Sequence, residues 1–183
     1  MNLSTYNPER LRFLKIKYDG EEMTLKYERM NHQGQWDEYS LKSRLEPHKD
    51  FINVMDRLAD VQMTMCELLT GDFDETHYGQ ELNRHDIRGV SLSYGEDEGG
   101  NVVTGVTITS LRRLDRSNAP LTLNTPHKFD RTHTDHGDEE ILMDSDDMDV
   151  VMKLCQQALS YIEGKRKQLD MFAEAEQEEE VAA

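Results

Sequence analysis

The chain carries near its C-terminus a five-residue run with the make-up of a pocket-binding peptide, Gln168-Leu169-Asp170-Met171-Phe172. Apolar side chains such as Leu169 and Phe172 can fill a hydrophobic cleft, while a polar residue fixes the register at its rim. The run is preceded by Lys165-Arg166-Lys167. Three adjacent cations could face an acidic rim or phosphate groups. The sequence therefore predicts a basic binding arm here.

The run resembles the short peptide, roughly Gln-Leu-Ser/Asp-Leu-Phe, with which bacterial replication and repair proteins dock onto the DNA sliding clamp. The resemblance implies that Gln168 bonds at the pocket rim and that Leu169, Met171 and Phe172 enter the cleft. Met171 stands where the family more often has Leu, an exchange that typically costs under about 1.5 kcal/mol. The implied partner is the sliding clamp (β subunit) of bacterial DNA polymerase III.

A wider resemblance connects the whole layout to small proteins of phages and prophages. Two β-hairpins, two helices and a characteristic ending make up this layout. The ending consists of Tyr161, Ile162, Gly164, Lys165, Arg166 and Gln168. This resemblance implies no activity by itself.

An alternative interpretation places the same residues inside the protein. If the last helix continued past Gly164, the side chains of Ile162, Leu169 and Phe172 could share one buried stripe. A glycine inside a helix costs only about 1 kcal/mol relative to alanine, so the composition permits this.

A mixed imidazole and carboxylate cluster could in principle hold a divalent ion. Its members are His133, Asp135, His136, Asp138, Glu139 and Glu140. Their spacing matches no defined metal site, so a solvated polar loop is favoured. The sequence also lacks phosphate-binding glycine motifs and a nucleophile elbow. We therefore expect no catalytic residues, no metal and no cofactor, and a protein that is not an enzyme.

A second candidate surface lies on the first predicted hairpin. Basic residues there alternate with aromatic residues, as in proteins that bind single-stranded nucleic acid. The possible nucleic-acid face comprises Arg10, Arg12, Lys15, Lys17, Lys26 and Trp36. The alternative, which the pattern favours, is that the aromatic residues are core and the charges protect an edge strand.

The net charge of −16 on 183 residues is concentrated in the last quarter of the chain. Residues 1–134 carry 17 Lys/Arg against 22 Asp/Glu, a net of −5, and residues 135–183 carry 4 against 15, a net of −11. Such a field repels nucleic acid unless a local basic patch overcomes it. No apolar run reaches the roughly 20 residues of a membrane span. With two cysteines in apolar stripes and no secretion signal, we expect a cytoplasmic protein.

Hydrophobic periodicity predicts an α+β fold with an antiparallel sheet of about five strands. A three-strand meander begins with alternating residues 10–18, the turn Asp19-Gly20 and residues 23–27. A helix over 48–69, ended by Gly71, precedes a loop over 71–83. A second hairpin pairs residues 87–94 with residues 102–111, and residues 121–123 add a short strand. Ser145 is predicted to cap a C-terminal helix that Gly164 ends.

These elements predict a core domain over residues 1–125 and an acidic linker over 126–144. A C-terminal helix packed on the core follows over 145–164, and the binding arm with a disordered acidic tail over 165–183. The order of three strands, a helix and two strands also occurs in oligonucleotide-binding barrels.

Three functions follow as expectations. The first is a non-enzymatic accessory of DNA replication or recombination that docks on the sliding clamp, as a helper or as a blocker of host polymerases. The second is a single-stranded DNA-binding protein with a barrel and a regulatory acidic tail. The third is an acidic inhibitor of a host nucleic-acid-binding protein, for which carboxylates would have to be fixed at phosphate-like spacing.

Overall fold

The computed structural model describes residues 5–68, 75–97, 99–131 and 142–166. The strands are β1 (Leu11–Tyr18), β2 (Met23–Met30), β3 (Trp36–Ser43), β4 (His85–Glu96), β5 (Val102–Leu114), β6 (Ser117–Asn124) and β7 (Lys128–Phe129). The helices are α1 (Lys49–Met65), α2 (Glu75–Leu82) and α3 (Ser145–Ile162). The predicted α+β class with an antiparallel sheet, a central helix and a C-terminal helix is confirmed.

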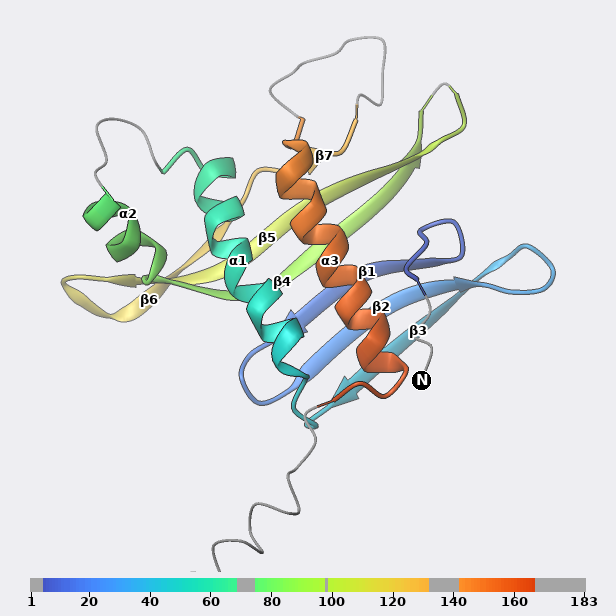
Figure 1. Cartoon of the computed structure of the whole chain (residues 1–183), viewed down its shortest axis with the longest axis horizontal. Coiled ribbons are helices and arrows are strands. Elements are labelled where there is room, and N and C mark those ends of the chain that lie inside the picture. The colour runs from blue at the N-terminus through green and yellow to red at the C-terminus, as the bar shows by residue number, and fades with distance from the viewer. Residues whose placement is uncertain (1–4, 69–74, 98, 132–141, 167–183) are drawn as a thin grey trace, which may run out of the picture.

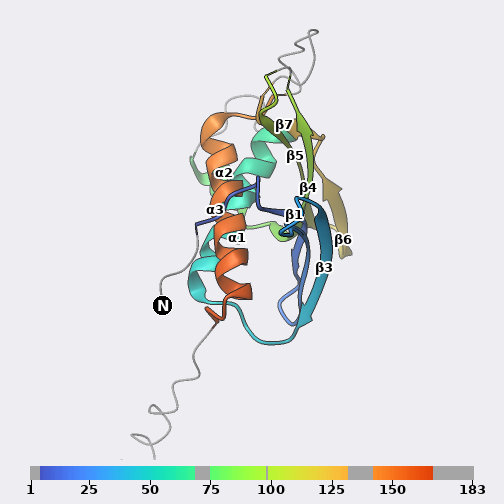
Figure 2. The same cartoon turned by 90° about the vertical axis from the view of Figure 1, so that its right-hand side faces the viewer.

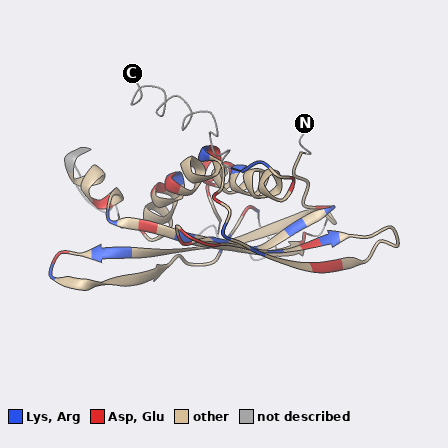
Figure 3. Ribbon diagram, turned by 90° about the horizontal axis from the view of Figure 1, so that it is seen from below, with Lys and Arg blue, Asp and Glu red and all other residues tan. Residues whose placement is uncertain are grey.

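The sheet has the strand order β3-β2-β1-β4-β5-β6, and β7 pairs with β5 beside this path. The first meander thus joins the second through the antiparallel pair of β1 and β4. Helices α1 and α3 lie side by side on one face of the sheet, and none of the described helices covers the other face (Figures 1 and 2). Seen from below, the molecule is a layer of helices over a twisted sheet (Figure 3). The expectation of an oligonucleotide-binding barrel is wrong, because β3 and β6 lie at opposite ends of the strand order.

The core lies between the sheet and the two long helices. Alternation along the strands points one set of side chains at the helices, among them Ile16, Leu25, Val90 and Ile108, which are all buried. Helix α1 contributes its apolar stripe, and α3 contributes residues such as Leu154. Because both helices are polar on the outside, each buries only one face, as expected for a two-layer fold.

The long helices begin and end at definite caps. His48 is the N-cap of α1, and its ring nitrogen accepts from the amide of Asp50. Helix α1 ends at Met65, with Glu67 at a positive φ of 53°, so the prediction that Gly71 ends this helix is wrong. For α3 the N-cap is Asp144 and not Ser145, because the Asp144 carboxylate accepts from the amide of Asp146 at 2.8 Å.

Several segments differ from the expected pattern. Part of the predicted loop 71–83 forms α2, a helix of 8 residues. Strand β6 is longer than predicted and includes Pro120, which a sheet tolerates at its edge because an edge strand has unpaired backbone groups. The predicted linker 126–144 contains β7, which pairs with β5. Within the described residues, none of the helices has the length and hydropathy needed to cross a bilayer.

Candidate functional site

The predicted binding arm begins where α3 ends. Helix α3 is closed by a pair of hydrogen bonds: the amide of Gly164 donates to the carbonyl of Tyr161, and the amide of Lys165 donates to that of Ser160. Gly164 has a φ of 101°, a conformation that favours glycine. A glycine at this position lets the chain turn back, so that amides beyond the helix donate hydrogen bonds to its last carbonyl groups. The alternative interpretation, in which the helix continues past Gly164, is wrong.

The first residue of the arm, Lys165, is held by side chains of both long helices. Its ammonium group donates to a carboxylate oxygen of Asp50 at 2.6 Å and to the amide oxygen of Gln157 at 3.4 Å. The Lys165 hydrogen bond lowers the pKa of Asp50 below its ordinary value, against a smaller opposing effect of burial. Lys165 therefore ties the start of the arm to the N-terminal turn of α1.

Tyr161 supports the next residue of the arm. The Tyr161 hydroxyl donates to the carbonyl of Leu45 at 2.7 Å, and its ring is almost fully buried. The guanidinium group of Arg166 lies 5.0 Å from the centre of that ring, within the range of a cation–π contact. The backbone of Arg166 also forms an isolated antiparallel bridge with Pro47. The chain is thus fixed through residue 166 beside the start of α1.

These contacts change the expectation for the basic residues of the arm. Lys165 and Arg166 already have partners inside the protein, so two of the three predicted free cations stabilise the fold instead. The five residues of the motif itself, Gln168 to Phe172, lie outside the described residues. The predicted metal cluster from His133 to Glu140 also lies outside them, and within the described residues no group of three or more potential ligands is found.

The structure places the six residues of the predicted nucleic-acid face in different surroundings. Arg10 precedes β1, and the guanidinium group of Arg12 packs over the ring of Trp36 at 4.2 Å. Trp36 is half-buried there. Of the remaining three residues, Lys15 and Lys17 lie on β1 and Lys26 lies on β2, directly opposite Lys15.

The aromatic residues near this face belong to the core side of the sheet. Tyr18 and Tyr27 pack against the hydrophobic core, and the Tyr27 ring stacks on that of Tyr39 at 5.3 Å. They are therefore not stacking platforms beside the lysines, as the favoured alternative expected of them. Its other half, that the charges protect an edge strand, is wrong, because β1 and β2 are interior strands of the sheet.

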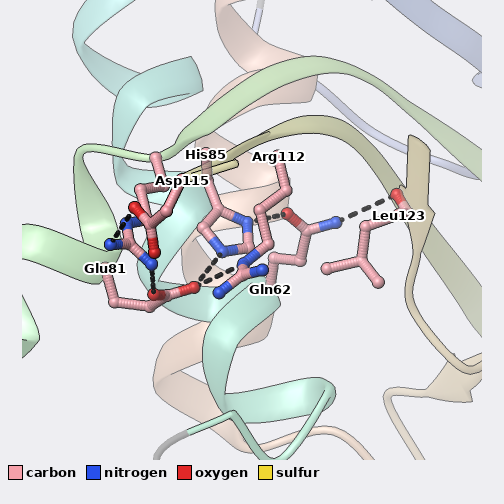
Figure 4. Close-up of polar contacts among 7 residues, drawn as sticks. Gln62, Glu81, His85, Arg112, Asp115 and Leu123 are labelled. Carbon is pink, nitrogen blue, oxygen red and sulfur yellow. Dashed lines mark hydrogen bonds and ion pairs between the residues drawn. The ribbon is translucent and has the colours of Figure 1, made fainter. Parts of the chain in front are cut away.

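A polar network that the sequence did not predict joins α1, α2 and the sheet (Figure 4). Glu81 of α2 is its centre: its carboxylate accepts from Arg112 of β5 at 2.5 Å and from Arg84 at 3.3 Å. Arg84 in turn lies 2.6 Å from Asp115. The Arg112 hydrogen bond lowers the pKa of Glu81. This network fastens the short helix α2 to the rim of the sheet.

His85 and Gln62 form the buried end of the same network. The Gln62 side chain is fully buried, and its amide nitrogen donates to the carbonyl of Leu123 at 3.2 Å (Figure 4). Its oxygen must then accept, so Nδ1 of His85, which is 3.0 Å away, carries a proton; the other ring nitrogen, Nε2, lies 3.4 Å from a carboxylate oxygen of Glu81. Burial lowers the pKa of His85, in spite of the nearby Glu81 carboxylate. A glutamine inside the apolar stripe of α1 was the one sequence signal for this site.

A serine–histidine pair lies on the face of the sheet that none of the described helices covers. His127 bonds Ser93 at 3.0 Å through Nε2 and Thr107 at 3.0 Å through Nδ1. These are nucleophile–base distances. A threonine hydroxyl, however, lacks the negative charge with which a carboxylate stabilises an imidazolium. His127 is also exposed and packs edge-on against Phe129. The arrangement serves as a hydrogen-bonded support for the segment leading into β7.

Comparison with known proteins adds no assignment. No family model matches the chain, and neither curated proteins nor solved structures gave a match.

Proposed function

We propose that this protein is a non-enzymatic accessory of DNA replication or recombination that docks on the bacterial DNA sliding clamp through Gln168 to Phe172. The observation that carries the proposal is the run Gln-Leu-Asp-Met-Phe, which begins two positions after the anchored residue Arg166. In this proposal, Leu169, Met171 and Phe172 fill the hydrophobic cleft of the clamp and Gln168 bonds at its rim.

The end of α3 supports this assignment. Because Gly164 closes the helix and Arg166 pairs with Pro47, α3 ends before the proposed docking peptide begins. A peptide that binds in another protein's pocket cannot at the same time be part of a helix packed on its own core, and a helix that ends before it is compatible with this. The contacts of Lys165 and Arg166 fix the backbone just before the proposed peptide.

The mechanism is tethering. A peptide with three apolar anchors binds with about micromolar affinity. Once it is bound, the short connection between Arg166 and Gln168 keeps the folded domain beside the clamp and the DNA that the clamp encircles. The local concentration of the domain there rises to the millimolar range typical of short linkers.

Isothermal titration of the purified clamp with the full chain tests the proposal. The variant carrying both Leu169→Ala and Phe172→Ala should weaken binding by about 30-fold or more, because apolar anchors in a pocket contribute at least about 2 kcal/mol. Met171→Leu is the matched control, since it restores the more frequent residue of the family and should bind as well or better. Equal binding of the double variant and the unchanged chain would rule out this peptide as the docking site.

A further inference from the structure

Strand pairing lines up side chains in rows that run across the sheet, and three of these rows are neighbours. The middle row runs through Leu41, Leu25, Ile16, Val90 and Ile108, and faces α1 and α3. Because successive residues of a strand point to opposite faces, the rows on either side of it face away from the helices. Figure 2 shows that the described helices leave this second face uncovered.

These two outer rows contain lysine and hydroxyl residues and no acidic residue. The first row is Ser40, Lys26, Lys15, Ser91 and Thr107. The second row is Lys42, Thr24, Lys17, Gly89, Thr109 and Asn124. We call the two rows together the lysine strip. In a chain with a net charge of −16, two acid-free rows crossing five and six strands form a local basic patch.

The centre of the lysine strip contains a like-charge pair. Lys15 and Lys26 are directly opposite each other on β1 and β2 and are both exposed. Like charges in this position destabilise a sheet. Neither lysine has a carboxylate partner within the described residues, whereas Lys17 and Lys42 lie 3.6 Å from Asp19 and 3.4 Å from Glu22. A bound anion between Lys15 and Lys26 would relieve their repulsion.

The borders of the strip limit what can bind to it. The next row on one side consists of Arg12, Glu28 and Glu38, and Asp19 and Glu22 lie at the other side. Two rows lie about 7 Å apart, and six strands span about 24 Å. A DNA duplex, whose major groove alone is about 12 Å wide, would bring phosphates over these carboxylates. A single strand fits between them.

We propose that the lysine strip binds the backbone of single-stranded nucleic acid. Lys15 and Lys26 contact phosphates at the centre, and Lys17 and Lys42 contact them along the second row. The hydroxyls of Thr24, Ser40 and Ser91 donate to phosphate oxygens. Because the strip lacks stacking aromatic residues, binding depends on salt more than on base sequence.

Fluorescence anisotropy of a labelled oligothymidylate of about 20 nucleotides, with the full chain in about 20 mM salt, tests this proposal. Four phosphate contacts predict a slope of about −3 for the logarithm of the association constant against that of salt concentration. The variant with Lys15→Gln and Lys26→Gln should bind about tenfold more weakly, with a slope near −1.4. A matched control with Lys49→Gln and Lys153→Gln removes the same charge from the helix layer and should bind as the unchanged chain does.

Two further variants separate the lysine strip from the docking peptide and from the acidic tail. The variant Leu169→Ala with Phe172→Ala should keep its affinity for the oligonucleotide, so that failure of clamp docking and failure of this proposal are distinguished. Changing the five tail glutamates to glutamine (Glu174→Gln, Glu176→Gln, Glu178→Gln, Glu179→Gln and Glu180→Gln) should leave binding unchanged or strengthen it. The proposal is overturned if neither this tail variant nor the unchanged chain binds, if the two lysine pairs behave alike, or if a duplex of the same length binds as tightly.

Discussion

The ammonium nitrogen of Lys165 lies 2.6 Å from a carboxylate oxygen of Asp50, and so joins the end of α3 to the start of α1 across 115 residues. In the sequence, Lys165 lies three positions before the first residue of the proposed docking peptide. Together with the hydrogen bond from the Tyr161 hydroxyl to the carbonyl of Leu45, it fixes the backbone at the end of α3. The contact can be tested without any binding partner.

Replacing Lys165 by glutamine should raise the pKa of Asp50 toward the ordinary value, because the Lys165 hydrogen bond is the largest cause of its lowering. Carboxyl carbon shifts in an NMR titration measure this directly. In the unchanged chain the pair stabilises the fold above the ordinary pKa of aspartate, and this contribution disappears as pH falls through the lowered value. Lys49 makes the smallest of the contributions that lower the pKa of Asp50. Lys49→Gln should therefore leave the Asp50 titration nearly unchanged. No change in the Lys165 variant would contradict the contact.

Gly164→Ala should destabilise the protein by about 1–2 kcal/mol, because an L-residue is strained at the φ of 101° that closes α3. Urea unfolding measures the difference. The matched control is Gly79→Ala in the interior of α2, where an added Cβ meets nothing within 4 Å. That change should stabilise by about 0.5–1 kcal/mol. If both variants were equally stable, α3 would not end in the way described.

Gly89→Ala should cost about 1–3 kcal/mol for a different reason, the close approach of β1 and β4. A Cβ at position 89 would lie 2.5 Å from the carbonyl oxygen of Ile16 and 3.1 Å from the Cα of Lys17. Since both are backbone atoms, the two strands would have to move apart. Thermal unfolding should show a lower Tm than that of the chain with Gly79→Ala. An unchanged Tm would mean that the β1–β4 pair is looser than its register indicates.

Much of the fold follows from local sequence patterns. The turn Asp19-Gly20 and the alternation around it predict the β1–β2 hairpin, and Gly20 adopts the positive φ that such a turn needs. The apolar stripes predict both long helices to within a few residues, and Gly164 marks the end of α3. These features depend on residues that are neighbours in the chain.

Features that depend on distant contacts were not predicted. The α2 sequence is polar and contains Gly79, so its helix depends on the contacts of Glu81 with Arg84 and Arg112. The pairing of β1 with β4 is what turns two separate meanders into one open sheet instead of a barrel. It also brings Ser91 and Thr107 into line with Lys15, a row that no local pattern indicates.

Stability should fall in mildly acidic solution because of His85. Burial lowers the pKa of this histidine in the folded state, so the unfolded chain binds the proton more readily. The free energy of unfolding should therefore fall as pH drops below the unfolded value of about 6.5, and level off below the folded pKa. Urea unfolding of the chain and of His85→Gln between about pH 7.5 and about pH 5 measures this. The variant should show a smaller fall, and an equal fall would contradict the lowered pKa of His85.

Competition at the sliding clamp tests the central claim most directly. A fluorescent peptide with the sequence Gln-Leu-Ser-Leu-Phe is first bound to the purified clamp, and the full chain is then added at increasing concentration. Our proposal predicts complete displacement of the peptide at about micromolar concentration, and little displacement by the chain with Leu169→Ala and Phe172→Ala. A clamp that keeps its fluorescent peptide at saturating concentrations of the full chain would contradict the proposal.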